Sequence, residues 1–379
     1  MIPYLIPLIL IIAGIMFYDV QDRTTNRRWL YWLIYIYIVV LFGLRYRIGW
    51  DTLGYMMFYE DFPTFATASE ASLDEFGQMQ PGIQFLWLCL KSIGAPFWVY
   101  QLIHSTFINA VIFWFIMRNT RYWFCGLLIY YLCYCIYFNT EIMRESIAIA
   151  IFMMSYKHLE KRRWIRYYIC VATAYMFHVS ALILAVYPLA IIFNLRFDKK
   201  LIIGVLAVVG VLLLARGYVL DLVGIFGQTY GQKLMKYSSD LSTGNINSNW
   251  MILRFIRYVV FPASLCLIWK YKLKREIKYE AMICLFIIFG AGILVFQEMF
   301  VRMTNYPMPF LYVWIASILG TGIRIPSRRK MMAYALLAVV MLLNTYETVR
   351  MTIDFHTFAP YSWVVNPEKD KVRESLTNF

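Results

Sequence analysis

The sequence predicts an all-α polytopic membrane protein with about twelve transmembrane helices, and two observations support this fold class. Hydrophobic residues make up 61% of the 379 residues and charged residues only 15%, whereas soluble proteins are about 45–50% apolar and about 25% charged. Apolar segments of about 17 to 25 residues, the length that crosses a bilayer as a helix, recur between charged clusters. We therefore predict a single integral membrane domain over residues 1–379, surrounded by lipid bilayer.

The individual elements follow from the length of each apolar segment. Candidate spans lie at residues 2–18, 29–44, 97–117, 122–138, 141–157, 163–178, 179–195, 200–217, 251–269, 280–297, 305–322 and 331–346. The first has no small-residue cleavage site, so we expect a retained helix and not a signal peptide. The segment 82–93 is too short to span and ends in Gly94-Ala95-Pro96, which predicts a re-entrant or interfacial helix.

The distribution of lysine and arginine indicates the orientation in the membrane. Basic clusters occur at residues 23–28, 118–121, 157–166, 196–200, 270–278 and 324–330. All of them fall on one side if the segment 82–93 does not cross, and that side is then cytoplasmic. The loops 45–81 and 218–250 and the tail 347–379 are predicted to face outward. Because these clusters account for much of the net charge of +14, the charge indicates topology control, and we expect no nucleic-acid partner.

Several charged residues lie at the predicted outer interface, where topology does not require them. The expected phosphate-binding residues are Arg45, Arg47, Arg144, Arg254, Arg257 and Arg302, with Tyr55 beside a sugar. Arginine forms bidentate contacts with phosphate oxygens, so a pyrophosphate at headgroup depth is the expected ligand. Snorkelling to the headgroups is an equal alternative for Arg254 and Arg257. No acidic cluster is dense enough to hold a divalent ion, so we expect no metal and no cofactor. Arginines would then stabilise the leaving group.

Two residues are candidates for catalysis. His178 could take a proton from a sugar hydroxyl, because its unperturbed pKa of about 6.5 suits a base at neutral pH, or it could be a hydrogen-bonded packing residue. Gly49 lets the chain turn sharply, so Asp51 could fold back on Arg45 or Arg47 and orient an arginine. Alternatively, this pair only closes the loop, or Asp51 is itself the general base.

Four stretches carry a family resemblance in the order in which they occur. These are "LRYRIGWDTLGY", "EIMRESIAIAIFMMSYKHLEKRRWIRYYICVATAYMFHVSALI", "EMFVRMTNYPMPF" and "FAPYSWV". Together they resemble the EpsG family of bacterial exopolysaccharide proteins, which are related to Wzy-type polymerases. The resemblance assigns importance to Arg45, Gly49, Asp51, Tyr55, Arg144, His178 and Arg302. Family members often carry Gln where this chain has Glu145.

The resemblance implies an enzyme with GT-C-like architecture in the bacterial inner membrane. It would polymerise undecaprenyl-pyrophosphate-linked oligosaccharide repeat units into exopolysaccharide, capsule or O-antigen by metal-independent glycosyl transfer. The active site would face the periplasm or the cell exterior, and the partners would include a chain-length regulator and a flippase. One alternative is a transporter or flippase of the same lipid-linked sugars, although the inner halves of the spans lack a polar path. Another is a polysaccharide O-acyltransferase, which would not need this many outer arginines.

Overall fold

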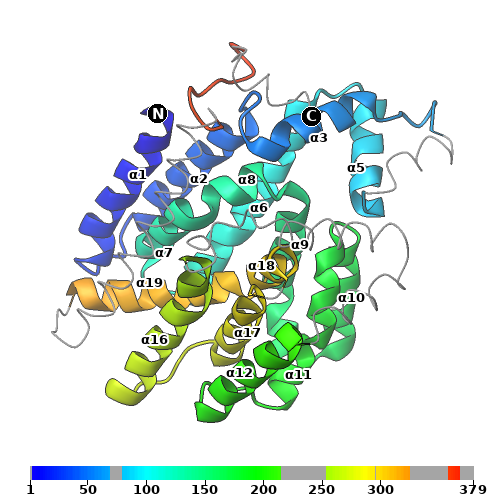
Figure 1. The fold of residues 1–379 in the computed structure, drawn as a ribbon. Coiled ribbons are helices and arrows are strands. Elements are labelled where there is room, and N and C mark those ends of the chain that lie inside the picture. Colours follow the sequence, from blue (N-terminus) through cyan, green and yellow to red (C-terminus); the bar gives the residue numbers. More distant parts are fainter. Residues whose placement is uncertain (1, 69–78, 215–252, 295, 325–356, 368–379) are drawn as a thin grey trace. The chain divides into compact units, whose positions relative to one another are not determined.

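The computed structural model describes residues 2–68, 79–214, 253–294, 296–324 and 357–367 (Figure 1). Helices form nearly all of the regular structure, and within these residues only isolated bridges have β geometry. The all-α prediction is therefore confirmed for the described part of the chain. The chain divides into two compact units, residues 1–185 with 315–379 and residues 186–314. Each unit is described by itself, and the single-domain interpretation stays a prediction.

The first unit is built around α6, the longest helix among the described residues. Tyr31 donates a hydrogen bond to the carbonyl of Phe113 at 2.8 Å and so ties α2 to α6. The amide nitrogen of Asn109 donates to Asn139 at 2.9 Å, and this buried polar contact joins α6 to α8. The helices of this unit are α1 (Ile2–Gly14), α2 (Arg27–Gly43), α3 (Trp50–Asp61), α5 (Pro81–Ser92), α6 (Phe97–Asn119), α7 (Trp123–Tyr130), α8 (Ile136–Thr140), α9 (Met143–Glu160) and α10 (Trp164–Tyr175).

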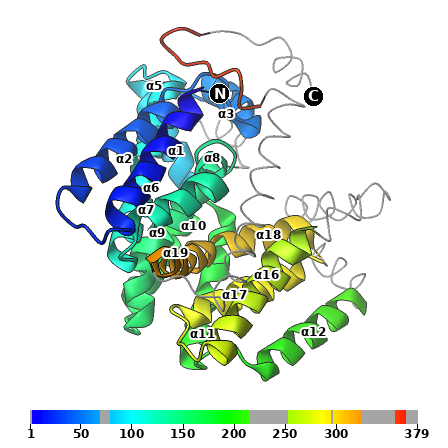
Figure 2. The same ribbon diagram turned by 90° about the vertical axis from the view of Figure 1, so that its left-hand side faces the viewer.

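The second unit contains shorter helices, most of which Figure 2 shows side by side. They are α11 (Tyr187–Ile192), α12 (Lys199–Leu214), α16 (Phe261–Leu267), α17 (Glu280–Gly292), α18 (Gln297–Asn305) and α19 (Met308–Arg324), the last of which continues into the first unit. The π-helical turns η4 (Ile256–Val260) and η5 (Ile268–Lys272) extend α16 at both ends.

Two predicted spans have different boundaries in the structure. The segment 280–297 is wrong in length, because α17 ends at Gly292 and α18 begins as a separate helix at Gln297. The segment 179–195 is not one α-helix either: it forms the 3₁₀ helix η3 (Val179–Val186), followed by α11. Pro188 explains this break, because a proline ring cannot continue an α-helix from the preceding turn but fits the first turn of a new one.

The number of membrane spans is confirmed only in part. Among the described residues, three helices are long and apolar enough to cross a membrane: Ile2–Asp19, Phe97–Asn119 and Trp123–Thr140. Shorter apolar helices accompany them. The total of about twelve therefore stays a prediction, and the candidate span 331–346 and the loop 218–250 lie outside the described residues. The short helix expected at 82–93 is confirmed as α5 and is followed by Gly94, with φ of +72°.

Candidate functional site

The site begins where the chain turns after α2. Gly49 has a φ of +105° and is followed directly by α3, which confirms the sharp turn expected from its freedom to adopt positive φ. A Cβ atom at this position would lie 2.7 Å from both Thr140 Cβ and Thr52 Oγ1. Glycine is thus required both by backbone conformation and by the close approach of α8. The helix α3 itself is an element that the sequence analysis did not predict.

Arg45 is the buried centre of this turn, with only 1% of its surface exposed. Its guanidinium donates to the carbonyls of Phe42 and Ile48, the latter at 3.2 Å, and lies 3.4 Å from Thr52 Oγ1 and 3.3 Å from Met143 Sδ. Burial lowers the pKa of Arg45 to about 10, so the group stays cationic at neutral pH. The hydrogen-bond partners of the Arg45 guanidinium are therefore groups of the protein itself.

Asp51 is not among the hydrogen-bond partners of Arg45, and its alternative pairing with Arg47 stays a prediction. Asp51 is exposed in the first turn of α3, whereas the guanidinium of Arg45 is buried beneath it. The carboxylate of Glu141 accepts hydrogen bonds from the backbone N–H groups of Trp50 at 2.9 Å and of Asp51 at 3.1 Å. Glu141 therefore caps the first turn of α3, where the helix dipole also stabilises a negative charge.

Glu141 lies in the turn between α8 and α9, and its protonation is sensitive to its surroundings. Burial, together with the neighbouring carboxylate of Asp51, raises the pKa of Glu141 to about 7. The hydrogen bonds from the amides of Trp50 and Asp51 and from Thr140 oppose this rise. The contact between α3 and α9 is thus closed by a carboxyl group that titrates near neutral pH, a feature that sequence spacing did not indicate.

Arg144 and Tyr55, two of the predicted site residues, contact each other. Arg144 stands in the first turn of α9 and Tyr55 in the middle of α3. The guanidinium Nε lies 3.4 Å from the Tyr55 hydroxyl, and Cζ lies 5.6 Å from the ring centroid. This distance is within the range of cation–π attraction. Both side chains are only partly buried, so a ligand can reach the edge of the pair.

His178 occupies the junction expected for it, between α10 and η3. The backbone N–H of Ser180 donates to His178 Nδ1 at 3.2 Å, and the Ser180 hydroxyl lies 2.6 Å from the same atom. A nitrogen that accepts a backbone N–H carries its lone pair there, so the proton of the neutral ring is on Nε2. In this tautomer His178 offers a hydrogen-bond donor from Nε2.

The short helix α5 links the Arg144–Tyr55 pair to the segment that carries His178. Tyr59, one turn beyond Tyr55, packs edge-on against Trp87 of α5 with ring centroids 5.4 Å apart. At the start of α5, the backbone N–H of Gly82 donates to the carbonyl of Met176 at 2.7 Å. Met176 precedes His178 by two residues. The helices α3 and α5 thus connect these site residues within the first unit.

His104 lies in the interior of α6. Its Nε2 is 2.9 Å from Ser146 Oγ, and Ser146 in turn donates to the carbonyl of Met143 at 3.0 Å. Because the serine has one proton, His104 must be the donor in the first contact. Only 1% of His104 is exposed. The histidine therefore supports the first turn of α9, where Arg144 stands.

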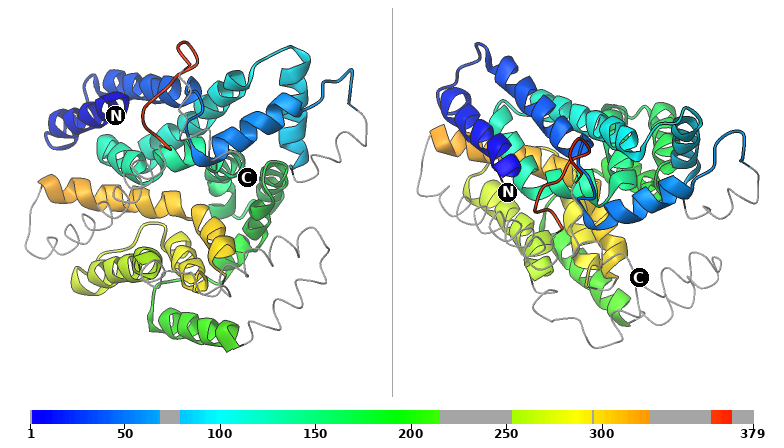
Figure 3. Two further views of the ribbon diagram at one scale, coloured as in Figure 1. Left: turned by 45° about the horizontal axis from the view of Figure 1, so that its top comes forward. Right: turned by 90° about the horizontal axis from the view of Figure 1, so that it is seen from above.

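A distant segment completes the turn around Arg45. Residues 357–364 run beside it, as Figure 3 shows for the red segment near α2. The amide of Tyr46 donates to the carbonyl of Ser362 at 2.9 Å, and Gly49 donates to Thr357 at 3.1 Å. Tyr361 donates to the carbonyl of Leu41 at 2.8 Å. Two segments that were both predicted to face outward therefore lie together.

The other predicted arginines are distributed over both units. Arg47 lies in the turn before α3, with φ of +52°, and stacks 5.6 Å from the ring centroid of Tyr46. Arg257 is in η4 of the second unit, 5.3 Å from the ring centroid of Tyr258. Arg254 and Arg302 also belong to the second unit, Arg302 in α18. The structure thus brings together Arg144 and Tyr55 within the first unit.

These features define the class of protein: over the described residues it is helical, its apolar helices indicate a membrane protein, and Arg144 in the first turn of α9 contacts Tyr55 in the middle of α3. The EpsG family model matches residues 28–363, which is most of the chain, so the protein belongs to the EpsG family. EpsG-type proteins are Wzy-like polymerases. Membership indicates a glycosyltransferase-like polymerase of polysaccharide biosynthesis. Comparisons with curated proteins and with solved structures found no match.

Proposed function

We propose that the protein polymerises undecaprenyl-pyrophosphate-linked oligosaccharide repeat units into exopolysaccharide, capsule or O-antigen at the outer face of the bacterial inner membrane. A hydroxyl of one repeat unit attacks the anomeric carbon of another. The bond between that carbon and the pyrophosphate oxygen breaks, and undecaprenyl pyrophosphate leaves with the electron pair. A chain-length regulator and a flippase are the expected partners, since the product must have defined length and the substrate must reach this face.

The observation that carries the proposal is the position of Arg144 on Tyr55. A guanidinium in the first turn of a helix adds its charge to the positive end of the helix dipole, so the two together attract an anion, although Glu145 in the same turn of α9 offsets part of this charge. The N-terminus of α9 has no side-chain cap, and backbone N–H groups at such an end bind phosphate oxygens. The proposed role of Arg144 is therefore to bind the pyrophosphate and to stabilise the charge that develops on it.

The remaining site residues of the first unit have two proposed roles, which are structural support and proton transfer. Arg45 and Glu141 hold the turn and the start of α3, so their proposed role is to position Tyr55 against Arg144. A general base needs an accessible lone pair. Asp51 has an exposed carboxylate, whereas the lone pair of His178 Nδ1 faces Ser180. We therefore assign the proton of the attacking hydroxyl to Asp51 and a donor role at Nε2 to His178.

The test is reconstitution of the purified protein in lipid vesicles with a lipid-linked repeat unit, followed by electrophoresis of the lipid-linked products. A ladder of longer products is expected. Arg144→Lys keeps the charge and loses the planar fork, so the rate should fall about ten- to hundredfold, as expected for one charge-assisted hydrogen bond worth roughly 1.5–3 kcal/mol.

Arg118→Lys is the matched control. Arg118 lies 5.6 Å from the ring centroid of Trp114, the same distance as between Arg144 and the ring centroid of Tyr55. Arg118 stands in the last turn of α6, in a basic cluster that is predicted to be cytoplasmic. Its replacement should leave the ladder unchanged. If Arg144→Lys behaves like Arg118→Lys, a bidentate phosphate role for Arg144 is wrong. If labelled substrate crosses the membrane and no ladder forms, the protein is a flippase and not a polymerase.

A further inference from the structure

The start of α5 meets the end of α10 in a direct junction between two helix ends. The first four backbone N–H groups of a helix and its last four carbonyls have no partner within that helix. Gly82 is the second residue of α5, and its N–H donates to the carbonyl of Met176, the C-cap residue of α10, at 2.7 Å. The two helix ends therefore satisfy each other, and the positive end of one helix dipole meets the negative end of the other.

A side chain at position 82 would block this junction. Pro81 opens α5 and has no N–H to donate, so Gly82 carries the first N–H of the helix. A Cβ atom on Gly82 would lie 2.6 Å from the carbonyl oxygen of Met176, well inside van der Waals contact. Glycine is thus the residue that gives α5 a donor able to reach the end of α10.

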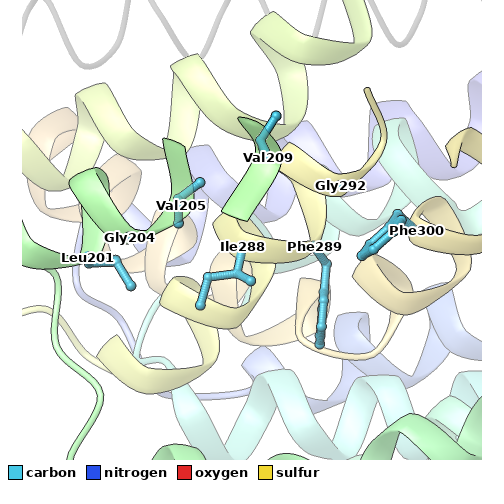
Figure 4. Close-up of a pocket in the computed structure, with 8 residues that line it drawn as sticks. All are labelled: Leu201, Gly204, Val205, Val209, Ile288, Phe289, Gly292 and Phe300. Atoms are coloured by element: carbon cyan, nitrogen blue, oxygen red, sulfur yellow. The ribbon is translucent and has the colours of Figure 1, made fainter. Parts of the chain in front are cut away.

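Other close glycine contacts meet a side chain and not the backbone. At Gly292 of α17, which Figure 4 shows next to Phe300, a Cβ would lie 2.3 Å from the phenylalanine ring. A side chain can change its rotamer to relieve such a contact. The carbonyl of Met176 belongs to the backbone, so it can withdraw only if the chain around it shifts. Gly82→Ala is therefore expected to displace the end of α10.

The displaced segment is the one that carries His178. The N–H groups of Phe177 and His178 both donate to the carbonyl of Ala174, at 3.0 Å and 3.1 Å, so hydrogen bonds connect the end of α10 to His178 without interruption. The imidazole is only 7% exposed, and its Nδ1 accepts the N–H of Ser180. A shift at Met176 is therefore passed on to the imidazole two residues later.

The other end of α5 is bonded to the helix that carries Tyr55. Tyr59, one turn beyond Tyr55 on α3, donates to the carbonyl of Ala95, shortly after α5, at 2.7 Å. The helix α5 has 12 residues and is therefore roughly 18 Å long. Its two ends thus hold the segments that carry Tyr55 and His178 at a spacing that the helix length sets.

We propose that Gly82 is a positioning residue for His178: by admitting the Met176 carbonyl to the first turn of α5, it fixes the imidazole relative to the Arg144–Tyr55 pair. The assignment rests on the proposed function for the donor role of His178, and it adds the residue that places this donor. Gly82 itself need not touch the substrate. The effect of Gly82→Ala on turnover should therefore disappear when His178 is absent.

A double-mutant cycle in the reconstituted polymerisation assay tests this dependence. Gly82→Ala should lower the rate about tenfold or more, because misplacement of a reacting group by about 1 Å can cost about a hundredfold. The loss should not exceed that caused by His178→Ala. In the His178→Ala background, Gly82→Ala should change the rate less than about twofold. Equal losses in both backgrounds, or no loss in the wild type, would overturn the inference.

Gly290→Ala is the matched control. A Cβ at Gly290 would also lie 2.6 Å from a backbone carbonyl oxygen, that of Tyr258, so the two variants introduce the same kind of clash. Gly290 belongs to the second unit, and any effect of its replacement should be the same with and without His178. If the effect of Gly290→Ala also disappears in the His178→Ala background, the cycle reports general damage and the inference is wrong.

A direct measurement on the imidazole separates this inference from the proposed function. The chain has four histidines, so the ring-nitrogen signals of the full-length protein in nanodiscs, labelled with nitrogen-15 histidine, can be assigned by comparison with His178→Ala. Gly82→Ala should shift the two His178 signals, and Gly290→Ala should not. If Gly82→Ala does not give monodisperse protein, Tyr59→Phe, which releases the other end of α5, replaces it with the same expectation.

The two readouts have distinct failures. Unshifted His178 signals in Gly82→Ala contradict the positioning role, whether or not a ladder of products forms. Shifted signals without a ladder from the wild type contradict the polymerase and leave the junction between α5 and α10 standing.

Discussion

Replacement of Gly49 by alanine tests whether the turn around Arg45 is as tight as the structure indicates. The φ of +105° is a region that residues with a side chain rarely adopt, at a cost of about 1–3 kcal/mol. The new Cβ would also lie 2.7 Å from Thr140 Cβ and Thr52 Oγ1, and overpacking of this kind costs about 1–3 kcal/mol. Reduced freedom of the unfolded chain returns about 0.4–1 kcal/mol.

The net destabilisation expected for Gly49→Ala is thus about 1–6 kcal/mol, a large share of the free energy of unfolding of an ordinary protein. The assay is thermal unfolding in detergent, followed by tryptophan fluorescence. Gly54→Ala is the matched control on the adjoining helix, because a Cβ there meets no atom within 4 Å, and it should be neutral or stabilising by up to about 1 kcal/mol. If the two variants unfold at the same temperature, the reasoning about this turn is refuted.

Three further predictions concern protonation and topology. Burial raises the pKa of Glu141 from its usual 4.5 to about 7, so its contribution to stability is complete below pH 4.5 and is lost as the pH rises through about 7. Thermal stability should fall over this window, less so in Glu141→Gln, and Glu60→Gln on the exposed face of α3 should follow the wild type. Asp51→Asn should abolish polymerisation, whereas His178→Ala should reduce the rate only in part; if His178→Ala abolishes polymerisation and Asp51→Asn does not, His178 is the base. For topology, the partly exposed native cysteines are replaced first. Glu60→Cys should then react with an impermeant maleimide on intact cells. Labelling of Lys161→Cys under the same conditions would contradict the predicted orientation.

Helix positions could be predicted where a long apolar run determined them. The span expected at 97–117 is α6, Phe97–Asn119, because its apolar run is long and starts directly after Pro96. The helix α3 could not be predicted in this way, since its 12 residues are too few to span a membrane and show weak amphipathicity. Its first turn depends on Glu141, which is about ninety residues away in the sequence. Only tertiary contact reveals such a cap.

The candidate site shows the same division. Residue type and position at the outer interface selected Arg144 and Tyr55, and the structure brings them together. The role of Arg45 was not accessible, because a sequence cannot distinguish an arginine that binds ligand from one that is buried and bonded to its own turn. The tautomer of His178 depends likewise on the backbone of Ser180, two residues later, which spacing alone does not define.

The contact between residues 44–49 and residues 357–364 has a consequence for biogenesis. The turn around Arg45 leaves the ribosome early, but the backbone partners that Tyr46, Gly49 and Leu44 use are translated near the end of the chain. Until then, the early helices must remain in the membrane with this turn incomplete. A ribosome that stops before Thr357 therefore releases an inserted protein whose site has not closed. Assembly of the site thus reports that translation has passed this point, so truncated copies should insert into the membrane and yet remain inactive.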